Sequence, residues 1–110
     1  MFDLSQIKEA NAKAKEKSAE RKEDFTGKLN QGMDLFRKFQ ESGSEKEIKE
    51  AADYFFQAIE LQSNRIEPYI QISAIFHIFG LKEQAEKYLN EARKINPEAE
   101  EVRELEKLLF

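Results

Sequence analysis

The sequence predicts that this chain folds entirely into α-helices. Helix-favouring alanine, glutamate, lysine, glutamine and leucine are abundant among its 110 residues, and only two prolines and four glycines interrupt them. Apolar residues make up 40% of the chain and charged residues 36%, and the apolar ones recur at steps of three and four. That spacing traces one face of a helix, so each helix should have a core face and a solvent face. The length corresponds to a single domain with a modest core.

The first 24 residues differ from the rest of the chain. They hold six basic and six acidic residues, which cancel, and few large apolar side chains. Local charge pairs can make such a segment helical, but it has little to bury, so residues 1–24 are expected to form a frayed or helical extension. A thin apolar stripe at helical spacing, which favours docking on another copy of the protein, consists of Leu4, Ile7, Ala10 and Ala14.

Loop signals divide the remaining residues into helices. Apolar side chains from Leu29 to Phe39 predict a helix that begins near Asp24. The clearest loop is Ser-Gly-Ser at residues 42–44. Ser44 followed by Glu47 matches a capping box, which predicts the start of a helix over about residues 45–62.

The second half of the chain has equally clear boundaries. Asn64, Arg65 and Pro68 mark a junction, because proline is best tolerated in the first turn of a helix. A helix over about 67–79 should end at Gly80, a suitable C-cap. Two more helices are expected, over about 82–95, ending at Asn-Pro, and over about 98–109.

One helix face occurs twice in the sequence, 34 residues apart: EAADYFFQAIELQ at 50–62 returns as QAEKYLNEARKIN at 84–96. Upstream, the face from Leu29 to Phe39 returns 40 residues later, from Tyr69 to Phe79. The difference between the two spacings predicts six extra residues in the turn of the first pair. The matched positions of the second helices are Ala51 with Ala85, Tyr54 with Tyr88, Phe55 with Leu89, Ala58 with Ala92 and Leu61 with Ile95.

Helix pairs that repeat at 34 residues, with small residues at fixed points and aromatic residues between them, resemble the tetratricopeptide repeat family over about residues 26–109. The second pair matches best, since Gly80 lies at its turn and Pro97 closes it. The first pair departs from the family pattern at Met33, where a small residue is usual, and at Ser63, where proline is usual. The family's large-large-small-aromatic signature is matched by Tyr69, Ile72, Ser73 and Phe76.

The resemblance implies an α-α superhelix of tetratricopeptide-like antiparallel helix pairs, preceded by an N-terminal helical extension. Residues 25–110 would form this domain, with pairs over about 26–62 and 66–96 and a capping helix over about 98–109. Small residues let the backbones of a pair approach closely, and this role falls to Ala51, Ala58, Ala85 and Ala92. Larger side chains fill the gaps between pairs, namely Phe55, Phe76, Phe79 and Leu89.

The sequence predicts no enzyme, metal site or cofactor site, because it contains no recognisable combination of catalytic, metal-ligating or phosphate-binding residues. The chain has no cysteine and one histidine, His77, which excludes a thiolate zinc site, an imidazole cluster and a conventional triad. Its four glycines are scattered, so there is no phosphate-binding loop. The carboxylates of Glu45, Glu47, Glu50, Glu98, Glu100, Glu101 and Glu104 are interpreted as solvated helix surface.

The net charge of −4 argues against general affinity for nucleic acid. The lysines between Lys8 and Lys22 are largely neutralised by interleaved glutamates, and no aromatic residue accompanies them for base stacking. The longest nearly apolar run, Ile72 to Leu81, is too short to span a bilayer, and the N-terminus lacks the apolar core of a secretion signal. A cytoplasmic protein with no membrane span is therefore expected.

Solenoid repeats usually bind partners on the concave surface formed by the first helix of each pair, so the resemblance implies a protein or peptide partner there. Glutamine and asparagine side chains on this surface would form hydrogen bonds with the backbone of an extended partner peptide. Ile70 and Ala74 would add apolar contact, but they also break the clamp with which related proteins grip chaperone tails. Two interpretations of His77 stay open. It is either a half-buried histidine with a local hydrogen bond, or a residue that contacts the ligand in the groove, where the contact could depend on pH. The predicted partner-binding residues are Asn30, Gln31, Asp34, Arg37 and Lys38 from the first pair and Ile70, Gln71, Ala74 and His77 from the second. The alternative interpretation of these positions is that they are ordinary exposed residues.

Two functions remain open at this point. The first is a non-catalytic protein-protein interaction module, an adaptor or scaffold that binds a peptide or a partner helix in the groove. The second is a structural protein that forms a homo-oligomer through its N-terminal helix or its exposed solenoid ends. An apolar end of the last helix would favour the second function, and the residues concerned are Leu105, Leu108, Leu109 and Phe110.

Overall fold

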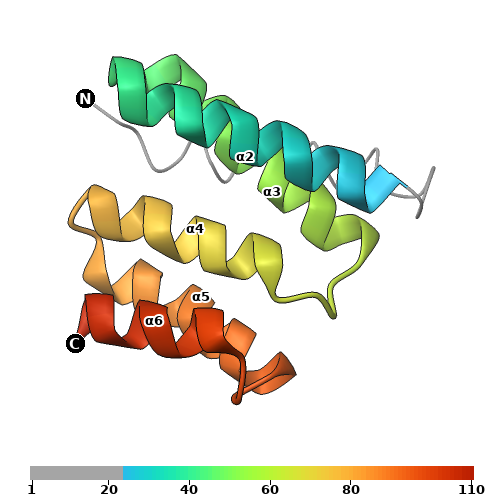
Figure 1. Ribbon diagram of the computed structural model, residues 1–110, viewed down its shortest axis with the longest axis vertical. Helices are drawn as coiled ribbons and strands as arrows, with labels where there is room; N and C mark the ends of the chain where they lie inside the picture. Colours follow the sequence, from blue (N-terminus) through green and yellow to red (C-terminus); the bar gives the residue numbers. More distant parts are fainter. Residues whose placement is uncertain (1–23) are drawn as a thin grey trace. The chain divides into compact units, whose positions relative to one another are not determined.

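The computed structural model describes residues 24–110, which form five α-helices (Figure 1). These are α2 (Phe25–Ser42), α3 (Glu45–Leu61), α4 (Glu67–Ile78), α5 (Lys82–Ile95) and α6 (Glu100–Leu109). Residues 24–110 contain no strand, so the prediction of an all-α fold is confirmed. The predicted N-terminal extension and its apolar stripe lie outside the described residues, apart from Asp24.

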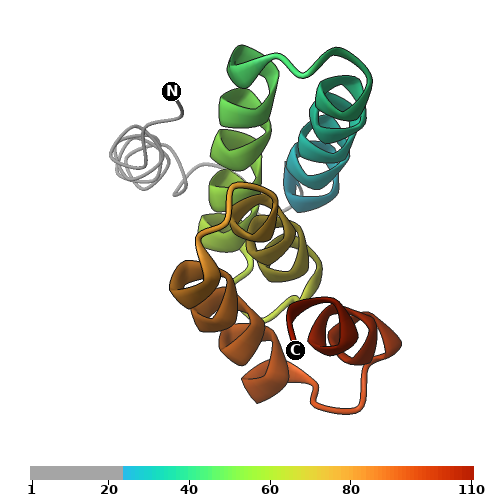
Figure 2. The same ribbon diagram turned by 90° about the vertical axis from the view of Figure 1, so that its left-hand side faces the viewer.

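The chain divides into two compact units, Met1–Ser63 and Asn64–Phe110. In the first unit, α2 and α3 run antiparallel and pack along their length (Figures 1 and 2). In the second unit, α4 and α5 form another antiparallel pair, and α6 packs against both of them. The helix boundaries expected from the sequence agree with the observed ones to within about two residues.

The first hairpin differs from the second in the length of its helices. α2 has 18 residues against 12 in α4, and α3 has 17 against 14 in α5. Only Gly43 and Ser44 separate α2 from α3, whereas residues 79–81 separate α4 from α5. The prediction of six extra residues in the first turn is therefore wrong. Those residues continue both helices, because the glutamates, lysines and glutamine near this turn favour helix and the apolar face continues to Phe39.

Both hairpin turns contain a glycine with left-handed backbone, with φ of 71° at Gly43 and 72° at Gly80. A side chain at either position would be strained. After α4, the N–H of Gly80 donates to the carbonyl of His77 at 3.0 Å, and the N–H of Leu81 donates to that of Phe76 at 2.9 Å. These two bonds form a Schellman motif, which satisfies carbonyls that the helix leaves free. The prediction that Gly80 terminates this helix is confirmed.

The capping box predicted at the start of α3 is wrong. Ser44 does occupy the N-cap position, but its side chain makes no capping hydrogen bond. Instead, the hydroxyl of Ser42 donates to Oε1 of Glu47 at 2.7 Å and accepts the N–H of Ser44 at 3.1 Å. The left-handed turn at Gly43 brings Ser42 beside α3. The carboxylate of Glu47, which the capping box would have placed at the helix start, therefore accepts a hydrogen bond from Ser42.

In the first unit, α2 and α3 approach each other closely where a glycine of α2 contacts an aromatic ring of α3. Gly32 is buried on α2, and Phe55 of α3 is fully buried. A Cβ atom on Gly32 would lie 2.6 Å from Cε1 and 2.8 Å from Cδ1 of Phe55, well inside van der Waals contact. The ring therefore rests directly on the backbone of α2. On α3, Ala51 and Ala58 are fully buried, as predicted.

A buried serine holds α4 against α5 in the second unit. The hydroxyl of Ser73 donates to the carbonyl of Ala85 at 2.6 Å, which requires the two backbones to be close. Ala85 and Ala92 are fully buried, as predicted. Phe76 and Tyr88 stack with their ring centroids 5.6 Å apart. Burial, and to a smaller extent the charge of Glu91, raises the pKa of the Tyr88 phenol above its ordinary value.

The apolar face of α6 is buried against the α4–α5 pair. Val102, Leu105 and Leu109, which the sequence places on one face, are all buried. An ion pair between α5 and α6 supports this packing, since Nε of Arg93 lies 2.7 Å from Oε2 of Glu106. Both side chains remain about one third exposed, so the pair contributes no more than about 1 kcal/mol, and the apolar contacts hold the helix in place.

A matched pair of glycine substitutions on α2 tests the close approach. Gly32→Ala is expected to lower the free energy of unfolding by about 1–3 kcal/mol through overpacking against Phe55. Gly27→Ala, with nothing within 4 Å of the added Cβ, should raise it by up to about 1 kcal/mol, because alanine favours helix. Denaturant unfolding measures both. Equal effects at the two positions would contradict the packing described here.

A double substitution serves as the control. Phe55→Leu frees the volume that the new methyl group of Gly32→Ala needs. The doubly substituted chain should therefore be less destabilised than the sum of the two single changes.

Candidate functional site

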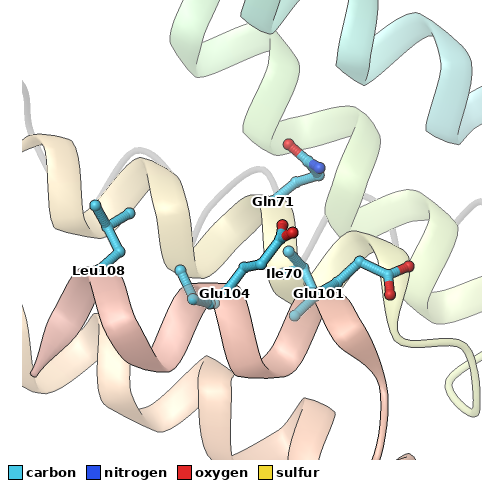
Figure 3. Close-up of a pocket in the computed structure, with 6 residues that line it drawn as sticks. Ile70, Gln71, Glu101, Glu104 and Leu108 are labelled. Atoms are coloured by element: carbon cyan, nitrogen blue, oxygen red, sulfur yellow. The ribbon is translucent and has the colours of Figure 1, made fainter.

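A shallow open groove lies between α4 and α6 within the second unit (Figure 3). Ile70 and Gln71 of α4 form one wall, and the groove has a volume of about 280 Å³. Figure 3 shows Leu108, Glu104 and Glu101 following one another along α6, with Ile70 of α4 close to the two glutamates and the side chain of Gln71 extending from α4 away from α6. The groove, called the α4–α6 groove below, is lined by Ile70, Gln71, Glu101, Glu104, Leu105 and Leu108.

The sequence of α6 explains how one short helix serves both the core and the groove. Residues 101, 104, 105 and 108 follow the helical steps of three and four, so they lie on one face. The buried stripe through Val102 and Leu109 lies next to this face, and Leu105 belongs to both. Burial of the first stripe therefore orients the second toward α4. Leu108, beyond the core contact, remains 57% exposed.

The walls of the groove are held by contacts on the sides away from it. Ser73, two residues beyond Gln71, anchors α4 to α5 through its bond to the carbonyl of Ala85. On α6, the buried Val102 and Leu109 pack against the α4–α5 pair, and the ion pair between Arg93 and Glu106 adds a weak contact to α5. Both walls are therefore attached to the same helix, which fixes the direction of the side chains that line the groove.

The groove carries unpaired negative charge. Both carboxylates, Glu101 and Glu104, are exposed, and neither forms an ion pair with any cation of the described residues. Two other acidic residues of this region are paired: Glu98 with Arg103 at 2.9 Å and Glu106 with Arg93. The α4–α6 groove thus combines an apolar floor, one amide and two free carboxylates.

The residues predicted on the second pair fall partly within this groove. Ile70 and Gln71 line it and are half-buried. Ala74 and His77 lie one and two turns further along α4, are also half-buried, and do not line it. The interpretation of His77 as a contact in a groove stays a prediction.

The residues predicted on the first pair belong to the other unit. All five lie on α2, and Asn30 and Gln31 are exposed. Asp34 accepts a hydrogen bond from Arg37 and lies 3.6 Å from Nζ of Lys38, so these three side chains form an exposed ion-pair cluster. A second hollow, of about 340 Å³, includes Gln31 and is otherwise lined by Asp24, Gly27 and Lys28.

Sequence reasoning missed the contribution of α6 to the groove. From the sequence, Glu101 and Glu104 are interpreted as solvated surface, and Leu105 and Leu108 as part of an apolar end of the last helix. The spacing of 101, 104, 105 and 108 was a usable signal, because it marks a second face beside the buried one. What the sequence did not indicate is that this face meets Ile70 and Gln71.

Among residues 24–110 no three metal-ligating side chains lie close enough together to hold an ion. In the same range, no helix combines the length and the apolar character needed to cross a membrane. The groove offers contacts suited to binding: apolar surface, an amide that both donates and accepts hydrogen bonds, and carboxylates that accept them.

Comparisons with protein-family models, with curated proteins and with solved structures find no match to this chain. The geometry of the groove and the repeat pattern of the sequence are thus the basis for a functional proposal.

Replacing the buried serine tests how the groove wall is held. Ser73→Ala removes the bond to the carbonyl of Ala85 and should lower the free energy of unfolding by about 0.5–1.5 kcal/mol. Ser44→Ala is the control, since the Ser44 side chain makes no capping bond, and it should change stability by less than about 0.5 kcal/mol. Thermal unfolding followed by circular dichroism measures both, and the reverse order would contradict the anchoring role.

Proposed function

We propose that this chain is a non-catalytic protein-protein interaction module that captures a peptide or a helix of a partner protein in the α4–α6 groove. The observation that carries the proposal is the exposed Leu108 in an open groove that Ile70 also lines, between two helices that both pack on α5. Apolar surface held in a fixed direction favours association, because binding then orders little of the protein.

The dimensions of the groove favour a polypeptide over a small molecule. Pockets that enclose small molecules have volumes of roughly 300–1,000 Å³ and bury most of the ligand surface. The α4–α6 groove, at about 280 Å³, is smaller than this range and open to solvent. It suits one or two side chains of a longer segment, whose backbone could exchange hydrogen bonds with the amide of Gln71.

The repeat pattern supports an architecture of the tetratricopeptide type. The small residues that the resemblance requires between paired helices are buried in both units. α6 carries an apolar face at the spacing of a first helix, so the groove between α4 and α6 corresponds to the surface between two successive first helices. We propose that the chain uses this surface, as solenoid repeats generally do.

A groove substitution with a matched control tests the proposal. Leu108→Ser combined with Gln71→Ala should weaken capture of a partner about tenfold or more, because apolar contact and a hydrogen bond are both lost. The control is Met33→Ser, an equally drastic change at a 44% exposed position on α2. The measurement is affinity capture by each tagged full-length variant, with melting temperatures recorded in parallel. Undiminished capture by the groove variant would rule out the groove as the binding surface.

A second candidate function is self-association through the end of α6. Leu108 and Phe110 are 57% and 67% exposed there, although Leu105 and Leu109 are buried. Two cations already lie over the ring of Phe110, with Nζ of Lys82 5.7 Å and the guanidinium carbon of Arg93 5.9 Å from its centroid. With these cations in place, Phe110 still presents apolar surface at this end.

Light scattering separates the two functions. An interaction module of the proposed kind should be monomeric, and its mass should not change on Phe110→Ser or on removal of residues 1–24. A dimer that dissociates on Phe110→Ser, while the melting temperature of the monomer is unchanged, would favour self-association through α6. A dimer lost only with residues 1–24 would favour the N-terminal segment.

A further inference from the structure

We infer that the segment captured in the α4–α6 groove is basic and amphipathic, with a lysine or arginine flanked by apolar side chains. This inference rests on the proposed function and names the chemistry of the partner. Two features of the groove carry it: the unpaired carboxylates and the apolar side chains that line the groove with them.

The carboxylates favour a cationic side chain. Glu101 and Glu104 lie one turn apart on α6, where like charges repel each other. Within residues 24–110 no cation pairs with either of them, whereas Glu98 and Glu106 have their arginines. A cation held beside both carboxylates relieves this repulsion and gains two attractive interactions at once.

The apolar residues favour a long cation with apolar neighbours. Ile70, Leu105 and Leu108 line the groove together with the two carboxylates, and Leu108 is largely exposed. Lysine and arginine lay their methylene stems on such surface while the charged group remains in water. A neighbouring leucine or similar residue of the partner would cover Leu108, whose exposure is otherwise unexplained by the packing of α6. The partner segment is therefore amphipathic.

Other partner chemistries fit less well. An acidic segment would bring a third negative charge to Glu101 and Glu104. A purely apolar segment would remove these carboxylates from water without supplying a partner, which is unfavourable. A basic segment satisfies the carboxylates and the apolar floor together, and charge attraction also speeds its approach.

Three designed peptides test the inference. They share one length and a leucine-alanine helical face, and their remaining positions are all lysine, all glutamine or all glutamate. Each is titrated into the isotope-labelled full-length chain, while the resonances of the Gln71 side-chain amide and of the backbone amides of residues 101–108 are followed. The lysine peptide should bind most tightly, and its affinity should fall as the screening length shrinks from about 10 Å at 0.1 M salt to about 3 Å at 1 M.

Charge removal in the groove provides the matched comparison. Glu101→Gln with Glu104→Gln should weaken binding of the lysine peptide about five- to tenfold, as expected for two exposed ion pairs. Glu83→Gln with Glu100→Gln removes the same charge at exposed positions outside the groove lining and should leave the affinity unchanged. Retained spectra of both variants confirm that they fold.

The outcomes separate this inference from the proposed function. If the glutamine peptide shifts the groove resonances as strongly as the lysine peptide, the groove binds polypeptides without regard to their charge. The inference of a basic partner is then overturned. If none of the three peptides shifts them, both the inference and the proposed function fail. If a peptide copying residues 1–23 binds more tightly than the lysine peptide, the occupant is this chain's own N-terminal segment, and the assignment to a partner protein is overturned.

Discussion

The close approach of antiparallel helices at small residues is the constraint on which the other features of this molecule depend. In the first unit the ring of Phe55 rests on the backbone of α2 at Gly32. In the second unit the hydroxyl of Ser73 reaches the carbonyl of Ala85. Neither contact tolerates a larger side chain on the first helix, because protein interiors are packed without spare volume. Each contact fixes the rotation of one helix against the next, and therefore the direction of every other side chain on it.

The two helix pairs meet this constraint with different distributions of volume. By the repeat spacing, Gly32 and Phe55 of the first pair correspond to Ile72 and Leu89 of the second, and all four residues are buried. The first pair combines the smallest residue with a large ring, and the second uses two aliphatic residues of similar size. Cores accept such exchanges when the total volume is kept. The two pairs can therefore share a repeat although they differ at single positions.

The candidate function follows from what the packing leaves uncovered. α6 buries one apolar stripe against α4 and α5, and this burial turns its neighbouring stripe toward Ile70 and Gln71. The carboxylates of that stripe have no cation among the described residues, whereas Glu98 and Glu106 pair with Arg103 and Arg93. A surface of fixed shape, with apolar residues and free charge in one small groove, is suited to recognising a side chain of another protein. Its specificity would come mainly from the charges, since the apolar contacts alone discriminate little.

Local signals in the sequence determined the helices, their approximate ends and most of their buried faces, because periodicity, glycine turns and proline positions act over a few residues. The resemblance to a repeat family assigned Ala51, Ala58, Ala85 and Ala92 to the close contacts between helices and made Ile70 and Gln71 candidates for a groove. Tertiary structure decided the rest. The extra residues of the first pair continue its helices, Ser42 takes the bond expected of Ser44, and α6 supplies Glu101, Glu104 and Leu108 to the groove. These outcomes depend on which side chains of neighbouring helices meet, because residue spacing along one helix shows which face is buried but not which residues of another helix that face contacts.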